Sequence, residues 1–317
     1  MKNSLCPLWL FIASALLPAP ARAEKLHLPP EATQGLEKLY GGEPDAAIER
    51  FRQIQKRQPD HPLGYLLEAN ARWWKIYCEA CELKWNTIDA WHRARQPDDD
   101  AYLRLADKAV QLAEARVEKD DLAEMHFYAG TGWLLRARLL GLRDDRRGTA
   151  RAGVKARAHL RRALELDPGL ADANTGLGLY NYYADTLSAM AKALRFFMGI
   201  PGGNKREGIR QLEIAMSKGE LTAVEARFYL AKNLRNYDHQ YERAAALLEP
   251  LVAKHPQNPI FLLILGDIQA KLSRGEQAAK SFGAARKATV LDERCTARVR
   301  QLAQAALTAL QAHRTSN

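Results

Sequence analysis

Two cysteines three positions apart are the side chains best suited to covalent chemistry in this sequence. The segment CEAC places Cys78 and Cys81 within residues 70–91, whose pattern predicts a helix. A C-x-x-C pair can be a redox centre, a disulfide or half of a metal site. The chain lacks the β-α-β pattern of a thioredoxin-type motif, no His follows Cys81 for haem attachment, and no second C-x-x-C completes a zinc site.

Three interpretations of this pair stay open. On a helix, the Cβ atoms of residues i and i+3 are about 5 to 6 Å apart, whereas a relaxed disulfide needs about 3.8 Å. A local disulfide between Cys78 and Cys81 therefore competes with two free thiols, and catalysis or metal binding is the third alternative. Cys295 is then unpaired or bonded to a distant cysteine that the sequence does not identify.

Cations gather in the middle of the chain. Ten Arg and Lys residues lie between Arg136 and Arg162, and Asp144 and Asp145 are the only acidic residues in that span. Such a tract creates a local positive field that favours an anionic surface or an acidic peptide, although a solvated helix face would have the same composition. The residues that we predict to face an anion are Arg143, Arg146, Arg147, Lys205 and Arg206.

The last two of these cations follow a glycine-rich loop, FMGIPGGNKREG, at residues 197–208. A phosphate-binding P-loop requires G-x-x-x-x-G-K-[ST] after a strand, and here Asn204 separates the glycine from Lys205 and no Ser or Thr follows. The pattern instead predicts a helix stop and a new helix capped by Asn204, with Glu207 placed to complete a capping box. Anion binding would rest only on a helix N-terminus beside two cations.

No catalytic set emerges. The eight histidines are scattered, H-E-x-x-H and G-x-S-x-G are missing, and Asp98, Asp99 and Asp100 stand in a proline-flanked turn. We therefore predict no catalytic residue, no metal ligand and no cofactor.

A repeat organises the elements that must position these residues. Ala244, Leu248, Leu251 and Pro256 are spaced 4, 3 and 5 apart, and the first three recur 34 residues later as Ala278, Phe282 and Ala285. The same spacing occurs in two upstream sets, Ala47, Phe51, Ile54 and Pro59, and Ala156, Leu160, Ala163 and Pro168. Small residues let paired helices approach, the large apolar residue fills the space between them, and proline ends the second helix.

Period and residue pattern together resemble the tetratricopeptide repeat of exported bacterial proteins. The resemblance implies an all-α fold, a right-handed α-solenoid of antiparallel helix pairs. We expect one such domain over residues 24–317, with the most regular repeats at about 225–292 and a C-terminal capping helix at about 294–312.

The middle of this array is irregular. Leu177 and Gly178 predict a first helix whose partner carries Gly208 and Leu212, so residues 184–203 form an insertion between the two. Residues 176–213 also resemble, more weakly, a pattern of eukaryotic outer-membrane and inclusion-body tetratricopeptide-repeat proteins. Insertions in solenoids map to loops on one face, which is often the binding face.

The resemblance further implies that the first helices of the repeats line a groove for a peptide or protein. On this basis the predicted binding residues are Asn174, Asn181, Tyr182, Asn233 and Arg235.

The N-terminus predicts export. Lys2, an apolar run at residues 5–17 and the sequence Ala21-Arg22-Ala23 form a signal peptide at residues 1–23, with cleavage after Ala23 and a periplasmic or secreted product. No later segment reaches the length of a membrane span. The formal net charge of +10 drops to about +8 when Lys2 and Arg22 are removed. An exported basic chain favours an anionic envelope surface or an acidic protein over nucleic acid.

Two functions fit these features. The first is a non-catalytic scaffold or adaptor that binds a protein segment in the solenoid groove and helps to assemble or tether a cell-envelope complex. The alternative is a small-molecule or anion-binding accessory component of an envelope transport system, which would use the inserted segment and the basic tract.

Overall fold

The computed structural model describes residues 26, 28–288 and 292–315 of the chain. Fourteen α-helices dominate the described part, and the predicted all-α solenoid is confirmed. None of these helices is both long and apolar enough to cross a bilayer. The predicted signal peptide and its cleavage site lie outside the described residues.

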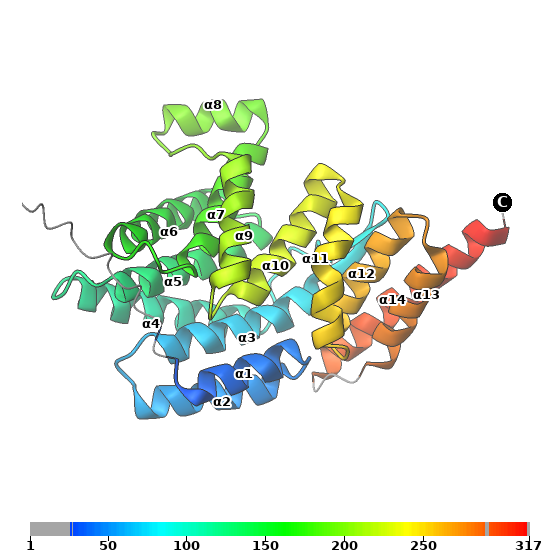
Figure 1. Ribbon diagram of the computed structural model, residues 1–317, viewed down its shortest axis with the longest axis horizontal. Helices are drawn as coiled ribbons and strands as arrows, with labels where there is room; N and C mark the ends of the chain where they lie inside the picture. The colour runs from blue at the N-terminus through cyan, green and yellow to red at the C-terminus, as the bar shows by residue number, and fades with distance from the viewer. Residues whose placement is uncertain (1–25, 27, 289–291, 316–317) are drawn as a thin grey trace, which may run out of the picture.

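The helices follow one another along the chain with short connections (Figure 1). Their bounds are α1 Pro30–Tyr40, α2 Pro44–Arg57, α3 Leu63–Ala80, α4 Asp99–Val117, α5 Ala123–Leu142, α6 Arg146–Leu166, α7 Ala173–Thr186, α8 Ala189–Phe197, α9 Lys205–Lys218, α10 Ala223–Asn233, α11 Tyr241–Lys254, α12 Pro259–Lys271, α13 Gly275–Lys287 and α14 Glu293–Thr315. A π-helical turn, η1 Leu234–Asp238, extends α10, and the strands β1 Cys81–Lys84 and β2 Thr87–Ala90 follow α3.

Small residues permit the close packing of helix pairs, as the repeat pattern predicts. A methyl group added at Gly266 of α12 would come within 2.7 Å of the Phe282 ring of α13. In the irregular middle, a methyl group at Gly178 of α7 would come within 2.8 Å of the Gly208 carbonyl of α9. The helices α7 and α9 therefore pack as a pair although α8 lies between them in sequence.

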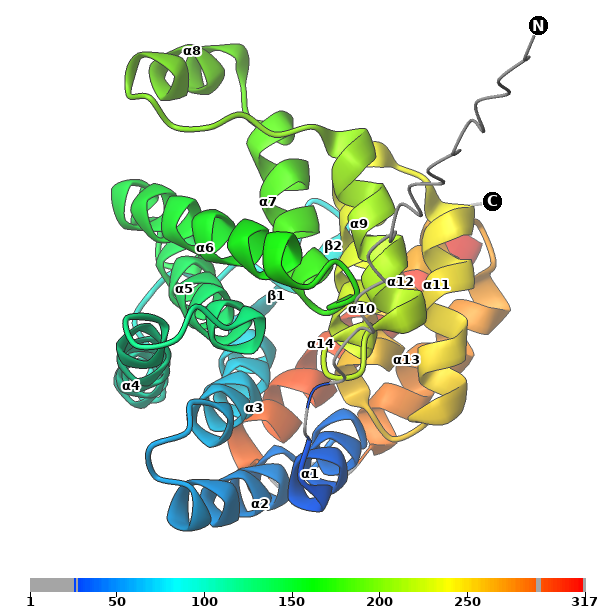
Figure 2. The ribbon, with the colours of Figure 1, turned by 60° about the vertical axis from the view of Figure 1, so that its left-hand side comes forward.

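The helical array curves so that α1 contacts α11 and the turn before α12 (Figure 2). Asn258, at the turn before α12, donates from Nδ2 to the Tyr40 carbonyl of α1 over 2.9 Å. Lys254 of α11 forms an ion pair with Glu37 of α1 at 2.8 Å. Residues more than 200 positions apart in sequence are thereby brought into contact.

The helix α3 lies at the centre of this closed arrangement. The Trp73 indole donates to the Tyr229 hydroxyl of α10 over 2.8 Å. The Trp74 ring lies 4.9 Å from Phe228 of α10 and 5.6 Å from Phe261 of α12. An aromatic core therefore joins the early repeats to the late ones.

The prediction of a helix over residues 70–91 is wrong for the residues after Ala80, where α3 ends. The chain there turns into an antiparallel hairpin, which pairs Cys81 with Ala90 and Lys84 with Thr87. Trp85 and Asn86 form the two-residue turn at φ values of 48° and 58°. Two consecutive left-handed residues suit the twist of a tight hairpin, and Asn tolerates this conformation.

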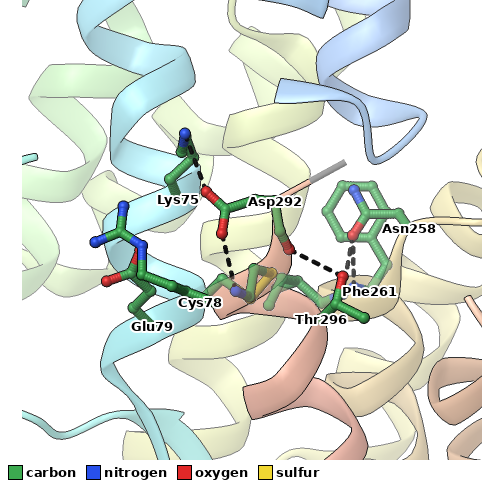
Figure 3. The surroundings of a disulfide bond; sticks show 10 residues. Lys75, Cys78, Glu79, Asn258, Phe261, Asp292 and Thr296 are labelled. Carbon is green, nitrogen blue, oxygen red and sulfur yellow. Dashed lines mark hydrogen bonds and ion pairs between the residues drawn. A yellow bond between two sulfur atoms is a disulfide. The ribbon is translucent and has the colours of Figure 1, made fainter. Parts of the chain in front are cut away.

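The disulfide also differs from the local bond that the sequence allows. Cys78 is bonded to Cys295 of α14, with a Cα–Cα distance of 5.5 Å (Figure 3). Because Cys78 is already bonded to Cys295, Cys81 at the start of β1 remains a buried free thiol. Beside the bond, Asp292 accepts from the Cys295 backbone N–H over 3.0 Å and forms an ion pair with Lys75 at 3.0 Å (Figure 3). The bond and the ion pair together join α14 to α3.

Candidate binding site

A pocket opens where the segment 91–98 meets the start of α4 and the end of α5. Its volume is about 400 Å³. The residues that line it are Arg93, Arg95, Asp99, Asp100, Leu103, Leu139, Leu140 and Arg143. The lining therefore combines three guanidinium groups and two carboxylates with three leucine side chains.

Arg143, the first residue after α5, forms the fixed part of this pocket. Its Nε and Nη2 atoms each donate to a carboxylate oxygen of Asp99 over 2.7 Å. It also donates to the His92 carbonyl over 3.0 Å and to Gln96 Oε1 over 3.1 Å. Because four hydrogen bonds hold the guanidinium, Arg143 shapes the pocket and holds the segment 91–98 against α4.

Arg93 and Arg95 form the adaptable part. Their side chains are 57% and 71% exposed. Arg93 forms an ion pair with Asp144 at 3.2 Å, and Arg95 forms one with Asp100. Exposed ion pairs contribute about 0 to 1 kcal/mol to stability, so a carboxylate of a ligand can replace Asp144 or Asp100 at small cost.

The predicted anion-facing residues do not form one cluster. Arg143 lines the pocket, whereas Arg146 and Arg147 stand exposed at the start of α6, where Arg146 forms an ion pair with Asp144 at 3.2 Å. Lys205 forms an ion pair with Asp238 beside the start of α9, and Arg206 is exposed there.

Sequence reasoning missed Arg93 and Arg95. Their signal was the run Arg93-Ala94-Arg95 between Trp91 and Pro97, a basic segment without helical periodicity.

The residues predicted to line a groove lie mostly in the interior. Asn174, Tyr182, Asn233 and Arg235 are buried, and Asn181 is half-buried. Tyr182 donates to the Asn233 carbonyl over 3.1 Å, and the Asn181 amide donates to Gln211 Oε1 over 2.8 Å. The partners of Asn181 and Tyr182 lie on the neighbouring helices α9 and α10, whereas Arg235 is covered across the curl by Asp89 of the hairpin. These side chains stabilise the fold from inside, which corrects the prediction that they face an open groove.

Arg235 belongs to a buried network of charges. It forms ion pairs with Asp267 at 3.0 Å and with Asp89 of the hairpin at 3.3 Å. Asp89 also accepts a hydrogen bond from the Tyr77 hydroxyl over 2.6 Å and pairs with Lys232 at 3.1 Å. Burial alone would raise the pKa of Asp89, but Lys232 and Arg235 hold it well below its usual range. The network fixes the hairpin to α10, η1 and α12.

The loop before α9 behaves as a helix start. The Asn204 side chain accepts from the Glu207 backbone N–H over 3.0 Å, so the predicted cap forms. Glu207 does not complete the capping box, because its carboxylate accepts from Arg210 over 2.6 and 2.8 Å.

Cys78 and Cys81 do not form a redox pair. Cys78 is bonded to Cys295, and burial raises the pKa of the Cys81 thiol well above its usual range. A protonated thiol is a poor nucleophile and a poor metal ligand. Throughout the described ranges, no group of three or more His, Cys, Asp or Glu side chains is arranged to hold a metal ion.

Comparisons with solved structures give distant similarities. The chain aligns with the human IFIT1 dimer with PPP-AAAA at 16% identity and a TM-score of 0.44. The alignment covers 90% of this chain and 63% of the IFIT1 chain, so this chain spans less than two thirds of the IFIT1 chain. It aligns with yeast Tom70 at 11% identity and a TM-score of 0.30, over 89% of each chain. It aligns with the TPR domain of P58(IPK) at 14% identity and a TM-score of 0.26, over 89% of this chain and 98% of the other.

Sequence comparison is more specific. No curated protein matches the sequence significantly. The family model of the tetratricopeptide repeat matches residues 33–80 and 237–289. The first match covers most of α1 and all of α2 and α3, and the second runs from η1 to α13. The chain therefore contains tetratricopeptide repeats near both ends of its helical array, at residues 33–80 and 237–289.

Proposed function

We propose that this protein is an exported, non-catalytic scaffold that binds an acidic segment of a protein partner at the pocket between α4 and α5. The observation that carries the proposal is the pocket itself, in which the exposed guanidinium groups of Arg93 and Arg95 stand beside Leu103, Leu139 and Leu140. A peptide with acidic and apolar side chains complements both parts. Tetratricopeptide repeats commonly bind proteins through surfaces of the solenoid.

Export is supported by two features. The first is the signal-peptide pattern of residues 1–23. The second is the bond between Cys78 and Cys295, because structural disulfides persist mainly in oxidising compartments such as the periplasm. We propose that a scaffold in this location helps to assemble or tether a complex of the cell envelope.

A pull-down from envelope extract tests the proposal. We expect the protein without residues 1–23 to recover one stoichiometric protein, and the double variant Arg93→Ala/Arg95→Ala to lose it. The matched control is Arg243→Ala/Arg274→Ala, which removes two partly exposed arginines that form ion pairs elsewhere. Equal recovery by both double variants would reject the pocket as the binding site.

A second candidate is an anion-binding accessory component of an envelope transport system. The cavity volume of about 400 Å³ favours it, since small-molecule sites commonly measure about 300 to 1,000 Å³. A thermal shift with small carboxylates or phosphate that Arg93→Ala/Arg95→Ala abolishes, with no protein recovered in the pull-down, would support this candidate over the scaffold.

A further inference from the structure

The helix α8 exposes an unusually apolar surface. None of its residues is buried. Met190 is 76% exposed, Leu194 58% and Phe197 83%, and Phe196 and Met198 are exposed as well. Figures 1 and 2 show α8 standing apart from the other helices at the end of α7. Soluble proteins rarely leave such a patch in water unless it binds something.

The polar side of α8 faces the protein. Lys192 donates to Asp185 over 3.1 Å, and Arg195 donates to the Pro201 carbonyl over 3.2 Å. Met190, Leu194 and Phe197 are spaced by four and three residues, so they share one face of the helix, opposite Lys192 and Arg195. This orientation is the reverse of a helix packed on a core, because the apolar face points away from the body.

Cations without a carboxylate partner lie beside α8. Arg157 of α6 stacks on the Tyr180 ring at 5.6 Å, and the Tyr180 hydroxyl donates to the Pro201 carbonyl that Arg195 also contacts. Within the described part of the chain, Arg157, Arg195 and Arg206 form no ion pair, whereas Lys192 and Lys205 do. The base of α8 is therefore positively charged.

We propose that α8 is a membrane-binding helix that lies in the surface of an anionic phospholipid bilayer. Amphipathic helices with large apolar side chains on one face and cations on the other bury the apolar face at the boundary between headgroups and acyl chains. Nine residues give α8 a length of about 14 Å. That length suits insertion along the surface and is too short for a span.

The cations favour lipid over a second copy of the chain as the occupant. Because α8 contains no Asp or Glu, a second copy of α8 would offer no carboxylate to these cations. Phosphate headgroups neutralise the same cations, and each one near an anionic surface strengthens binding about fivefold. A projecting helix also reaches a flat bilayer without interference from the rest of the fold (Figure 2).

Vesicle flotation tests the proposal with the protein lacking residues 1–23. We expect binding to vesicles of phosphatidylcholine and phosphatidylglycerol in equal parts, weaker binding to phosphatidylcholine alone, and weakening by salt. Leu194→Gln/Phe197→Gln should reduce the affinity by about a hundredfold or more, because it removes two apolar side chains from the bilayer. Since α8 buries no side chain in the fold, this variant should keep the melting temperature of the unmodified protein.

Controls make the result specific. Trp85→Gln/Leu122→Gln removes two exposed apolar side chains outside α8 and should bind vesicles normally. Hydrogen exchange at residues 189–197 should slow when anionic vesicles are added. Absence of vesicle binding, equal binding by the α8 variant, or self-association that depends on α8 without vesicle binding would each overturn the proposal.

Discussion

Replacement of Asp89 by Asn should destabilise the fold strongly. Asp89 is buried and accepts from Tyr77, Lys232 and Arg235, as well as from the Ala90 backbone N–H over 2.8 Å. The substitution preserves the shape of the side chain but removes the charge that compensates the buried Arg235 and the partly buried Lys232. Removal of one partner of a buried ion pair lowers the free energy of unfolding by about 3 to 5 kcal/mol. Because Asp267 still pairs with Arg235 at 3.0 Å, we expect a loss of about 3 kcal/mol in the free energy of unfolding.

Urea denaturation followed by circular dichroism measures this loss, and pH gives it a signature. The pKa of Asp89 is depressed in the folded state, so its charge stabilises the fold at pH values above the unfolded pKa of about 3.9. That contribution is lost as the pH falls. The difference between the unmodified protein and Asp89→Asn should therefore be full at pH 7 and shrink below about pH 5.

The matched control is Asp107→Asn, which removes an exposed carboxylate that pairs with Arg136. We expect it to change the free energy of unfolding by less than about 0.5 kcal/mol. The reasoning fails if Asp89→Asn has an effect as small as this control, or if its effect does not change with pH.

Two further predictions concern the disulfide and the helix packing. Thiol titration of the protein without residues 1–23 should find one reactive thiol, that of Cys81, and only after unfolding. The double variant Cys78→Ala/Cys295→Ala should lower the free energy of unfolding by up to about 5 kcal/mol, because the bond closes a loop of 217 residues. Two or three reactive thiols without reductant would contradict the bond. Gly178→Ala should lower the melting temperature by several degrees, because the added methyl group clashes with the Gly208 carbonyl. Gly283→Ala is the control and should leave the melting temperature unchanged, because its added methyl group meets no atom within 4 Å. Equal melting temperatures of the two variants would contradict the close packing of α7 and α9.

The repeat pattern predicted well which neighbouring helices pack as pairs, because its small and large apolar residues lie at the contacts between those helices. Gly178 and Gly208 identified α7 and α9 as a pair across the insertion, since both lie where backbones approach. The hairpin also had a signal that we interpreted wrongly. Trp85 and Asn86 stand between two four-residue segments that pair as strands, and Asn at a turn position is typical of a tight hairpin, which the predicted helix over residues 70–91 does not accommodate.

Contacts between distant repeats could not be predicted in this way. The bond between Cys78 and Cys295 and the packing of Trp74 on Phe261 depend on the curvature of the whole array, which accumulates from small rotations between repeats. The burial of Arg235 follows from the same closure, and it moves the candidate binding site from the inner surface to the pocket between α4 and α5.

Site-specific photo-cross-linking tests the binding of a protein partner at this pocket most directly. A photoreactive residue placed at Arg95, on the rim of the pocket, should capture the partner in envelope extract. The same residue at Arg274, an arginine whose ion pair with Glu242 is outside the pocket, should not. Capture from position 274 and not from position 95, or equal capture from both, would contradict the account.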